Sequence, residues 1–264
     1  MSELLQVTGL CIGLKNAGQP IVENVDFTLR KGSVLALVGE SGSGKTLTCK
    51  AVLQLLNART FDVSGSVLYK GADLLSMREK EIRSLCGCRI SMVVQNPMSA
   101  FDPTVKVGAQ IAETIRVHKK MERKDAYLAG CRALEKMDLP RCGQLMNSYP
   151  HTLSGGMLQR VVIALALILG PEIIIADEAT TALDVKNQKT ILDEIEKMKR
   201  SGISVLLVTH DFGVVARLAD DVIVMKEGRI VERGTVQSIF TAPKNQYTKE
   251  LLRASLLSGE NAHG

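Results

Sequence analysis

The feature that most constrains this chain is a glycine-rich segment between an apolar run and a helix-forming stretch. The apolar run is Val34–Val38, and helical apolar spacing follows over Thr46–Leu56. The segment fits G-x-x-x-x-G-K-S/T and consists of Gly39, Glu40, Ser41, Gly42, Ser43, Gly44, Lys45 and Thr46. Its glycines let backbone N–H groups curl around a phosphate at a helix N-terminus. This predicts a nucleoside triphosphate site, with Lys45 reaching the β- and γ-phosphates and Thr46 coordinating Mg²⁺.

The composition is that of an ordinary globular protein. Of the 264 residues, 45% are hydrophobic and 23% are charged, with a formal net charge of +5. This small, dispersed charge excess does not indicate a nucleic-acid-binding domain. The longest apolar run, Val161–Leu169, is too short for a membrane span, and the N-terminus has no signal-peptide pattern. We therefore expect a cytosolic globular protein whose six cysteines are reduced thiols.

Short apolar runs alternate with helical patterns along the chain. Ile173–Ala176 and Ser204–Val208 resemble Val34–Val38 in length and composition, as expected of strands buried on both faces of a parallel sheet. A helical pattern over Phe212–Ala219 follows one of them. Strands alternating with helices indicate the α/β class.

The flanking regions have different patterns. Val25, Phe27 and Leu29 alternate with polar residues, as in a half-buried strand, and a hairpin is expected near the C-terminus over 222–233. Helical patterns dominate between Glu79 and Ser154. We predict a P-loop ATPase core with a parallel sheet and flanking helices, an N-terminal antiparallel β subdomain and an inserted helical subdomain. The expected bounds within one domain are 1–85 and 160–264 for the core with the β subdomain, about 86–159 for the helical subdomain, and 258–264 for a loose tail.

Adjacent carboxylates end one of the predicted buried strands. Asp177 and Glu178 directly follow Ile173–Ala176. This placement suits Asp177 to hold Mg²⁺, directly or through water, and Glu178 to polarise an attacking water. An apolar strand ending in Asp-Glu is common by itself, so the interpretation depends on its occurrence together with Gly39–Thr46.

Two other strand ends carry polar candidates. His210 follows Ser204–Val208, at the edge of a parallel sheet where the phosphate site should lie, and is expected to contact the γ-phosphate. Gln95 follows Ile90–Val94, and its amide oxygen is expected to complete the Mg²⁺ shell.

A second anion-binding pattern begins another apolar helix. Gly155 and Gly156 expose backbone N–H groups there, and Ser154 adds a hydroxyl. One triphosphate does not need two such surfaces from one chain. We therefore expect a head-to-tail dimer in which this segment closes over the partner's nucleotide.

Taken together, these motifs resemble the ATP-binding subunits of ATP-binding-cassette (ABC) transporters from about Leu4 to Leu252. The corresponding motifs are Walker A at Gly39–Thr46, the Q-loop at Gln95, the signature at Leu153–Met157, Walker B at Ile173–Asp177, the catalytic Glu178, the D-loop at Ala182, Leu183 and Asp184, and the switch residue His210. The resemblance implies ATP and Mg²⁺ as ligands.

Further details are similar to the peptide/nickel importer branch. These are Met157 in the signature and the segment Asn96–Thr104. Leu14 stands where the family usually has an adenine-stacking aromatic, Ala179 replaces the usual Pro, and no Cys follows Cys142. The departures at Leu14 and after Cys142 resemble the first ATPase subunit of the nickel or metallophore subgroup.

The resemblance implies an importer of nickel, a metal–metallophore chelate or a short peptide. The implied partners are two membrane permease subunits, a second, related ATPase, and indirectly an extracytoplasmic binding protein, without nucleic acid. The implied location is the cytoplasmic face of the cell membrane. The alternative is a soluble ABC-type ATPase in DNA maintenance or translation, but the chain has neither an inserted coiled coil or zinc module nor a second cassette.

Three remaining candidates have simpler interpretations. Cys86 and Cys88 are expected to be free thiols rather than metal ligands, because no further ligand has suitable spacing. The basic run His118–Lys124 is expected to be a solvated helix face rather than a contact for acidic lipid or a partner. His151 is expected to make a local hydrogen bond.

Overall fold

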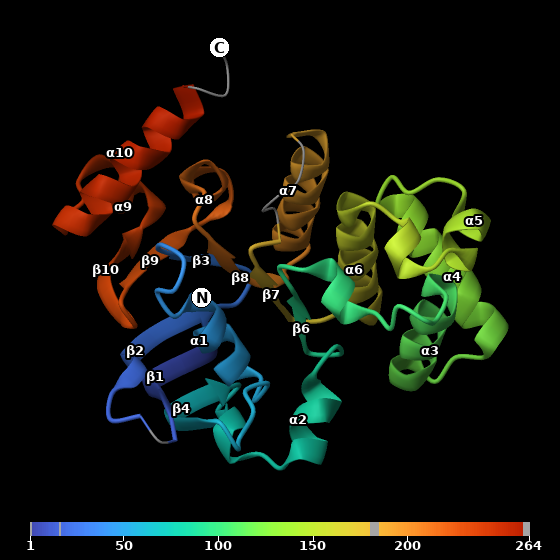
Figure 1. Cartoon of the computed structure of the whole chain (residues 1–264), viewed down its shortest axis with the longest axis horizontal. Coiled ribbons are helices and arrows are strands. Elements are labelled where there is room, and N and C mark those ends of the chain that lie inside the picture. Colours follow the sequence, from blue (N-terminus) through green and yellow to red (C-terminus); the bar gives the residue numbers. More distant parts are fainter. Residues whose placement is uncertain (1, 16, 180–184, 261–264) are drawn as a thin grey trace. The chain divides into compact units, whose positions relative to one another are not determined.

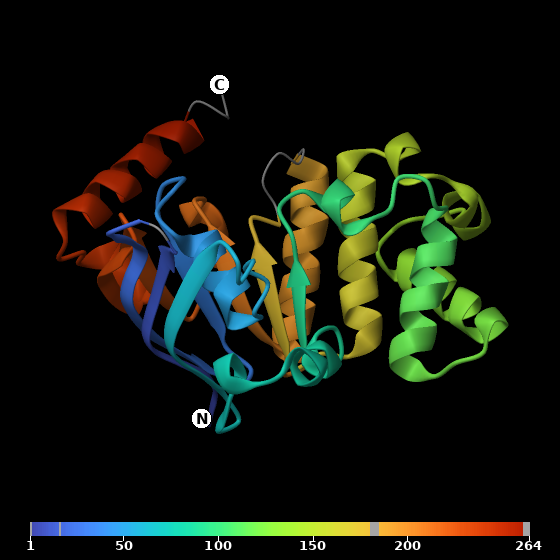
Figure 2. The same ribbon diagram turned by 60° about the horizontal axis from the view of Figure 1, so that its bottom comes forward.

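The computed structural model describes residues 2–15, 17–179 and 185–260. Contacts within the chain divide it into two compact units. Unit 1 comprises Met1–Arg83 and Met198–Gly264, and unit 2 comprises Ser84–Lys197. Figure 1 labels the helices and most strands, and Figure 2 shows the same ribbon from a second direction.

Unit 1 begins with an antiparallel sheet, confirming the predicted β subdomain. Its strands are β1 (Glu3–Leu14), β2 (Pro20–Arg30), β4 (Phe61–Tyr69) and β5 (Ala72–Asp73), in the order β2-β1-β4-β5. In β2, the alternating residues Val25, Phe27 and Leu29 are all buried. The period-two pattern thus orients the apolar face of this strand inward.

A group of mainly parallel strands forms the centre of unit 1. The strands are β3 (Val34–Val38), β8 (Ser204–Thr209), β9 (Asp221–Lys226) and β10 (Arg229–Thr235), in the order β10-β9-β3-β8. β3 is parallel to β8 and β9, and β10 closes the predicted hairpin with β9 (Figure 1). Every residue of β3 and β8 is buried, which agrees with the apolar sequence of β3 and of the interior of β8, between Ser204 and Thr209.

Helices connect the strands of unit 1. After β3 comes α1 (Lys45–Val52), which packs against β1, and after β8 comes α8 (Phe212–Leu218). Beyond the hairpin, α9 (Val236–Thr241) packs on β9 and β10, and α10 (Gln246–Glu260) contacts α8. A short 3₁₀ turn, η1 (Leu74–Ser76), follows β5, and the chain then passes through α2 (Glu79–Leu85).

Unit 2 combines a pair of parallel strands with a group of helices. The strands are β6 (Ile90–Val93) and β7 (Ile173–Asp177), which lie side by side in Figure 2. The helices are α3 (Val107–Lys119), α4 (Arg123–Lys136), α5 (Cys142–Asn147), α6 (Gly155–Leu169) and α7 (Val185–Arg200), with 3₁₀ turns η2 (Pro97–Ala100) and η3 (Pro150–Thr152). α3, α4, α5 and α6 pack together, and α6 also contacts β6.

This arrangement confirms the predicted α/β P-loop fold class. The helical patterns expected between Glu79 and Ser154 include α3 and α4. At the C-terminus, α10 extends to Glu260, into the segment expected to be a loose tail, and residues 261–264 lie outside the described ranges. In the part of the chain that the structure describes, no helix is both long and apolar enough to cross a membrane.

The expectation that every cysteine is a free thiol is wrong at one pair. Cys131 on α4 and Cys142 at the start of α5 form a disulfide, with Cα atoms 5.3 Å apart. The packing of α4 against α5 brings the pair together, which a sequence separation of 11 does not reveal. Cys11, Cys49, Cys86 and Cys88 are free.

Thiol counting tests this pairing. In protein purified without reductant and then denatured, we expect four of the six cysteines to react with a thiol reagent, and all six after reduction. Reduction should also lower the free energy of unfolding by about 2–4 kcal/mol, because the unfolded chain loses a covalent constraint. Titration of six thiols without reductant would contradict the pairing, and Cys131→Ser should leave its partner thiol reactive.

Candidate functional site

Backbone geometry that requires glycine forms the loop between β3 and α1. Gly39 has φ +152°, and a Cβ placed there would lie 2.2 Å from the Met225 carbonyl oxygen. Gly44, which caps α1, has φ +99°, and a Cβ there would lie 2.9 Å from a Val22 methyl carbon. The loop therefore passes too close to β9 and β2 to accommodate side chains at these positions.

Lys45 is buried inside its own loop. The side chain is 4% exposed, and Nζ donates hydrogen bonds to the carbonyl oxygens of Gly39 and Glu40, both at 2.8 Å. A third contact, at 3.3 Å, joins Nζ to the Ser43 hydroxyl. These oxygens offset the cost of burying the ammonium group and hold it at the end of β3. Thr46, the next residue, is half-buried in the first turn of α1.

His210 lies at the same strand edge as this loop. In the parallel pairing of β3 with β8, Val38 is opposite Thr209, so Gly39 and His210 are the next residues along each strand. His210 is exposed, and the following Asp211 caps α8 by accepting hydrogen bonds from the N–H groups of Gly213 and Val214. The local geometry thus fixes the turn and leaves the imidazole accessible.

In unit 2, a hydrogen bond joins two predicted site residues. β6 and β7 are parallel with Val93 opposite Ala176, so the residues after each strand share one edge. There the Gln95 amide Nε2 donates to the Glu178 carboxylate Oε2 at 2.7 Å. Glu178 has φ +47°, in the left-handed region, and Asp177 before it is 2% exposed. This backbone conformation is uncommon for Glu, and the hydrogen bond from Gln95 holds the carboxylate.

The signature segment begins α6 as the sequence predicts. Ser154 is the N-cap, and its hydroxyl accepts a hydrogen bond from the Met157 N–H at 3.3 Å. Ser154 and Gly155 are exposed, whereas Gly156 is buried. The start of this helix therefore presents polar groups at the surface of unit 2. Asp184, the remaining predicted binding residue, lies outside the described residues, as do Ala182 and Leu183.

The sequence reasoning missed two polar contacts to these loops. Gln159 on α6 is 2% exposed, and its Nε2 donates to the Val94 carbonyl at 3.4 Å, tying α6 to the segment that carries Gln95. The Tyr247 hydroxyl accepts a hydrogen bond from the Glu40 N–H at 3.1 Å. Gln159 is a polar residue just before the apolar run Val161–Leu169, and this position is the sequence signal that could have identified it. No local pattern marks Tyr247.

The available side chains have the chemistry that Mg²⁺ requires. Magnesium prefers oxygen ligands, especially carboxylates, with water completing the shell. Asp177 supplies a buried carboxylate, Gln95 an amide oxygen and Thr46 a hydroxyl. Taken unit by unit, Asp177 and Gln95 in unit 2 and Thr46 in unit 1 are donor types that Mg²⁺ accepts beside a nucleoside triphosphate.

Cys86, Cys88 and His151, the weaker candidates from the sequence, make local contacts. The Cys88 sulfur lies 3.2 Å from His118 Nδ1, and burial raises the pKa of the Cys86 thiol. Among the described residues, no group of three or more His, Cys, Asp or Glu side chains could hold a metal ion. His151 stacks on Tyr149, with ring centroids 5.7 Å apart.

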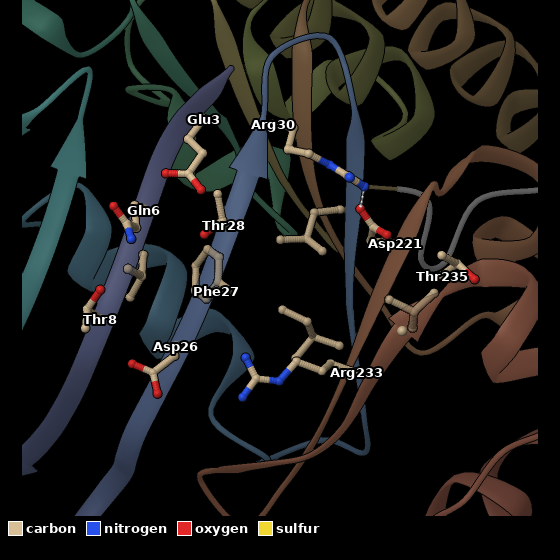
Figure 3. Close-up of a pocket in the computed structure, with 15 residues that line it drawn as sticks. Glu3, Gln6, Thr8, Asp26, Phe27, Thr28, Arg30, Asp221, Arg233 and Thr235 are labelled. Atoms are coloured by element: carbon tan, nitrogen blue, oxygen red, sulfur yellow. Dashed lines mark hydrogen bonds and ion pairs between the residues drawn. The ribbon is translucent and has the colours of Figure 1, made fainter. Parts of the chain in front are cut away.

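A large cavity in unit 1 is separate from the motif residues. It measures about 740 Å³ and is lined by residues of β1, β2, β3, β9 and β10. Figure 3 shows Arg30 paired with Asp221 on one side and Arg233 extending toward the middle. Its lining includes no residue of Gly39–Thr46 and not His210. Cavity size therefore does not identify the phosphate site in this unit.

Comparison with known proteins identifies the family. The family model described as "ABC transporter" matches residues 22–181. The dipeptide transport ATP-binding protein DppD of Bacillus subtilis is 44% identical, over 96% of this chain and 76% of that protein. The metal-staphylopine import system ATP-binding protein CntD of Staphylococcus aureus is 41% identical, over 94% and 92%. A dimeric structure of the ATP-binding cassette MJ0796 with ADP and Pi has a TM-score of 0.77 at 24% identity, covering 88% of this chain and 99% of that chain.

The class defined by this fold and these loops is the P-loop ATPases. More particularly, the chain belongs to the ABC transporter family, as one of its ATP-binding, ATP-hydrolysing subunits. The family resemblance inferred from the motifs is thereby confirmed.

Leu14 carries a prediction about the base. It ends β1 and is 39% exposed. By the family resemblance, we expect it to occupy the position where an aromatic usually stacks on adenine; the alternative is that another residue covers the base. Base–aromatic stacking is worth about 1–3 kcal/mol, which Leu cannot supply. We expect GTP to bind nearly as tightly as ATP, and Leu14→Tyr to tighten ATP binding by roughly tenfold for a gain of about 1.4 kcal/mol.

Direct titration of both nucleotides against the wild type and Leu14→Tyr measures this. Leu55→Tyr is the matched control, because Leu55 is also exposed but is not the residue at the end of β1. A strong ATP preference in the wild type that Leu14→Tyr leaves unchanged would exclude Leu14 as the base contact.

Proposed function

We propose that this chain is the ATP-hydrolysing subunit of a membrane importer for nickel, a metal–metallophore chelate or a short peptide. The names of its relatives support this substrate range, since DppD is a dipeptide transport protein and CntD belongs to a metal-staphylopine import system. In this proposal, ATP binding and hydrolysis drive uptake through separate permease subunits. The proposed location is the cytoplasmic face of the cell membrane.

The observation that carries the proposal is the hydrogen bond between Gln95 and Glu178. Glu178 is the proposed base that polarises the attacking water, and the Gln95 amide holds its carboxylate at 2.7 Å. Gln95 also begins the segment proposed to contact a permease. A shift of this segment would therefore change the orientation of the catalytic carboxylate, which connects transport to hydrolysis.

The other site residues have separate roles in this proposal. Lys45 and the N–H groups of Gly39–Thr46 bind the phosphates, and His210 contacts the γ-phosphate. Asp177, Gln95 and Thr46 would hold Mg²⁺, which supplies charge stabilisation to the phosphates when bound. Glu178 performs the remaining step, the deprotonation of the attacking water.

The segment after Gln95 is suited to docking against a permease. Asn96, Ser99, Ala100 and Thr104 are exposed. The segment is held by its own hydrogen bonds: the Asn96 carboxamide accepts the Met98 N–H at 3.1 Å, and the Asp102 carboxylate accepts the Thr104 N–H and hydroxyl at 2.8 and 2.7 Å. These bonds lower the pKa of Asp102, so its charge is kept. A prearranged exposed loop loses little conformational entropy on binding.

We propose that residues of about 86–159 form the helical subdomain. This subdomain, which includes the loop after Gln95, contacts the two permeases. The exposed Ser154 and Gly155 at the start of α6 support a signature that acts on a nucleotide held by another chain. In this proposal the other chain is a related but non-identical ATPase, and Asp184 is one of the nucleotide-binding residues. An extracytoplasmic binding protein delivers the substrate.

Glu178→Gln tests the catalytic assignment in the assembled transporter. We expect the variant to retain ATP binding and to lose at least about 100-fold in hydrolysis, because the base is removed while the phosphate loop is intact. Phosphate release and nucleotide titration measure the two effects. Glu172→Gln, just before the same strand, is the matched control and should hydrolyse ATP normally, because its exposed ion pair with Arg89 is worth little. Hydrolysis by Glu178→Gln within a few-fold of wild type would contradict the assignment.

Sedimentation of the isolated chain tests the partner. We expect a monomer with poor ATPase activity, both with and without ATP, and activation on addition of the second ATPase subunit. A stable homodimer formed on ATP, with robust activity, would contradict the heterodimer and leave the signature's action across a dimer intact.

A further inference from the structure

A side chain from the C-terminal helix reaches the phosphate loop. Tyr247 is the second residue of α10 and is 7% exposed. Its hydroxyl accepts the hydrogen bond from the N–H of Glu40, the second residue of the loop, across 207 positions of sequence. Tyr247 thus holds one peptide group of the loop.

The Tyr247 ring is itself fixed on two sides. Lys226 Nζ, at the end of β9, lies 4.8 Å from the ring centroid, a cation–π arrangement. The Tyr247 N–H donates to the Asn245 carboxamide oxygen at 2.9 Å, and Asn245 Nδ2 donates to the Val231 carbonyl at 3.3 Å. The hydroxyl therefore approaches Glu40 from a side chain tied to both strands of the β9–β10 hairpin.

The segment before α10 is anchored by a carboxylate. Glu232 on β10 accepts the N–H groups of Lys244 and Asn245 at 2.7 and 3.0 Å. Burial raises the pKa of the Tyr247 hydroxyl, so the phenol keeps its proton at neutral pH and can both accept and donate. The start of α10 is thus a rigid support rather than a loose end.

The same hairpin holds the other end of the loop. The Gly228 N–H donates to the Ser43 carbonyl at 3.1 Å. Within the loop, Lys45 Nζ bridges the Gly39 and Glu40 carbonyls. Because the loop binds phosphate through backbone N–H groups, bonds that hold it in place lower the entropy lost when a nucleotide binds. The Glu40 peptide is the point where Lys45 and Tyr247 act together.

We propose that Tyr247 is a positioning residue for the nucleotide, which acts through the Glu40 peptide and couples α10 to the occupancy of the phosphate loop. It does not touch the phosphates itself. By thermodynamic linkage, a nucleotide in the loop then stabilises the start of α10 as much as Tyr247 strengthens nucleotide binding. The inference requires only that this chain binds ATP, so it does not depend on the transported substrate or on the partner subunit.

The first test compares ATP affinity in the full chain. Tyr247→Phe keeps the ring and removes the hydroxyl, and should raise the ATP Kd about two- to tenfold, the range expected for one neutral hydrogen bond. Tyr127→Phe, on α4 in unit 2, is the matched control and should leave Kd unchanged. Thermal unfolding without nucleotide reports any general destabilisation. An unchanged Kd for Tyr247→Phe, or an equal change for Tyr127→Phe, would overturn the proposal.

The main measurement of the second test uses the wild-type chain, so it does not depend on whether a variant folds. Hydrogen exchange of the wild-type chain should slow on ATP addition over residues 246–255, and this slowing should shrink in Tyr247→Phe. A purely structural tyrosine would leave exchange at α10 insensitive to ATP. Exchange at α10 that ATP does not change in the wild type would contradict the coupling even if Tyr247→Phe fails to fold.

Discussion

The proposed phosphate site of unit 1 depends on the parallel pairing of β3 with β8 and β9. Val38 lies opposite both Thr209 and Val224, so the carboxyl ends of these strands meet at one edge. Gly39 and His210 leave the sheet at that edge. The apolar runs that form these strands are therefore functional as well as structural, because a register shift by one residue would separate the loop from the histidine.

The loop that begins at this edge is held by backbone contacts that only glycine permits. Gly39 passes against the Met225 carbonyl on β9, and the Gly228 N–H in the turn between β9 and β10 donates to the Ser43 carbonyl. The Lys45 ammonium is buried against loop carbonyls, so its charge is compensated before any phosphate arrives. The result is a preformed loop, the proposed phosphate site, with contacts to β9, to the turn before β10 and to the start of α10.

The sequence predicted those parts of the fold where a local pattern is sufficient. The bounds of β3 agree with the predicted run, and β7 and β8 extend the runs Ile173–Ala176 and Ser204–Val208 by one residue each. β4 was missed, because Ser64, Gly65 and Ser66 interrupt its alternation. α9, which has only 6 residues, and α10 were missed as well. The loop residues could be identified because their chemistry is local. The contact of Tyr247 with Glu40 and the disulfide Cys131–Cys142 could not, because each depends on tertiary packing.

A comparison of ATP, ADP and AMP binding to the wild-type chain tests most directly whether a preformed phosphate cradle dominates nucleotide affinity. Each N–H or ammonium contact to a charged phosphate is worth about 1.5–3 kcal/mol. We therefore expect ADP to bind within roughly tenfold of ATP and AMP at least about 100-fold more weakly, because AMP lacks the β-phosphate that the loop surrounds. AMP binding within a few-fold of ATP would show that contacts to the nucleoside supply most of the affinity, and would contradict a dominant phosphate cradle.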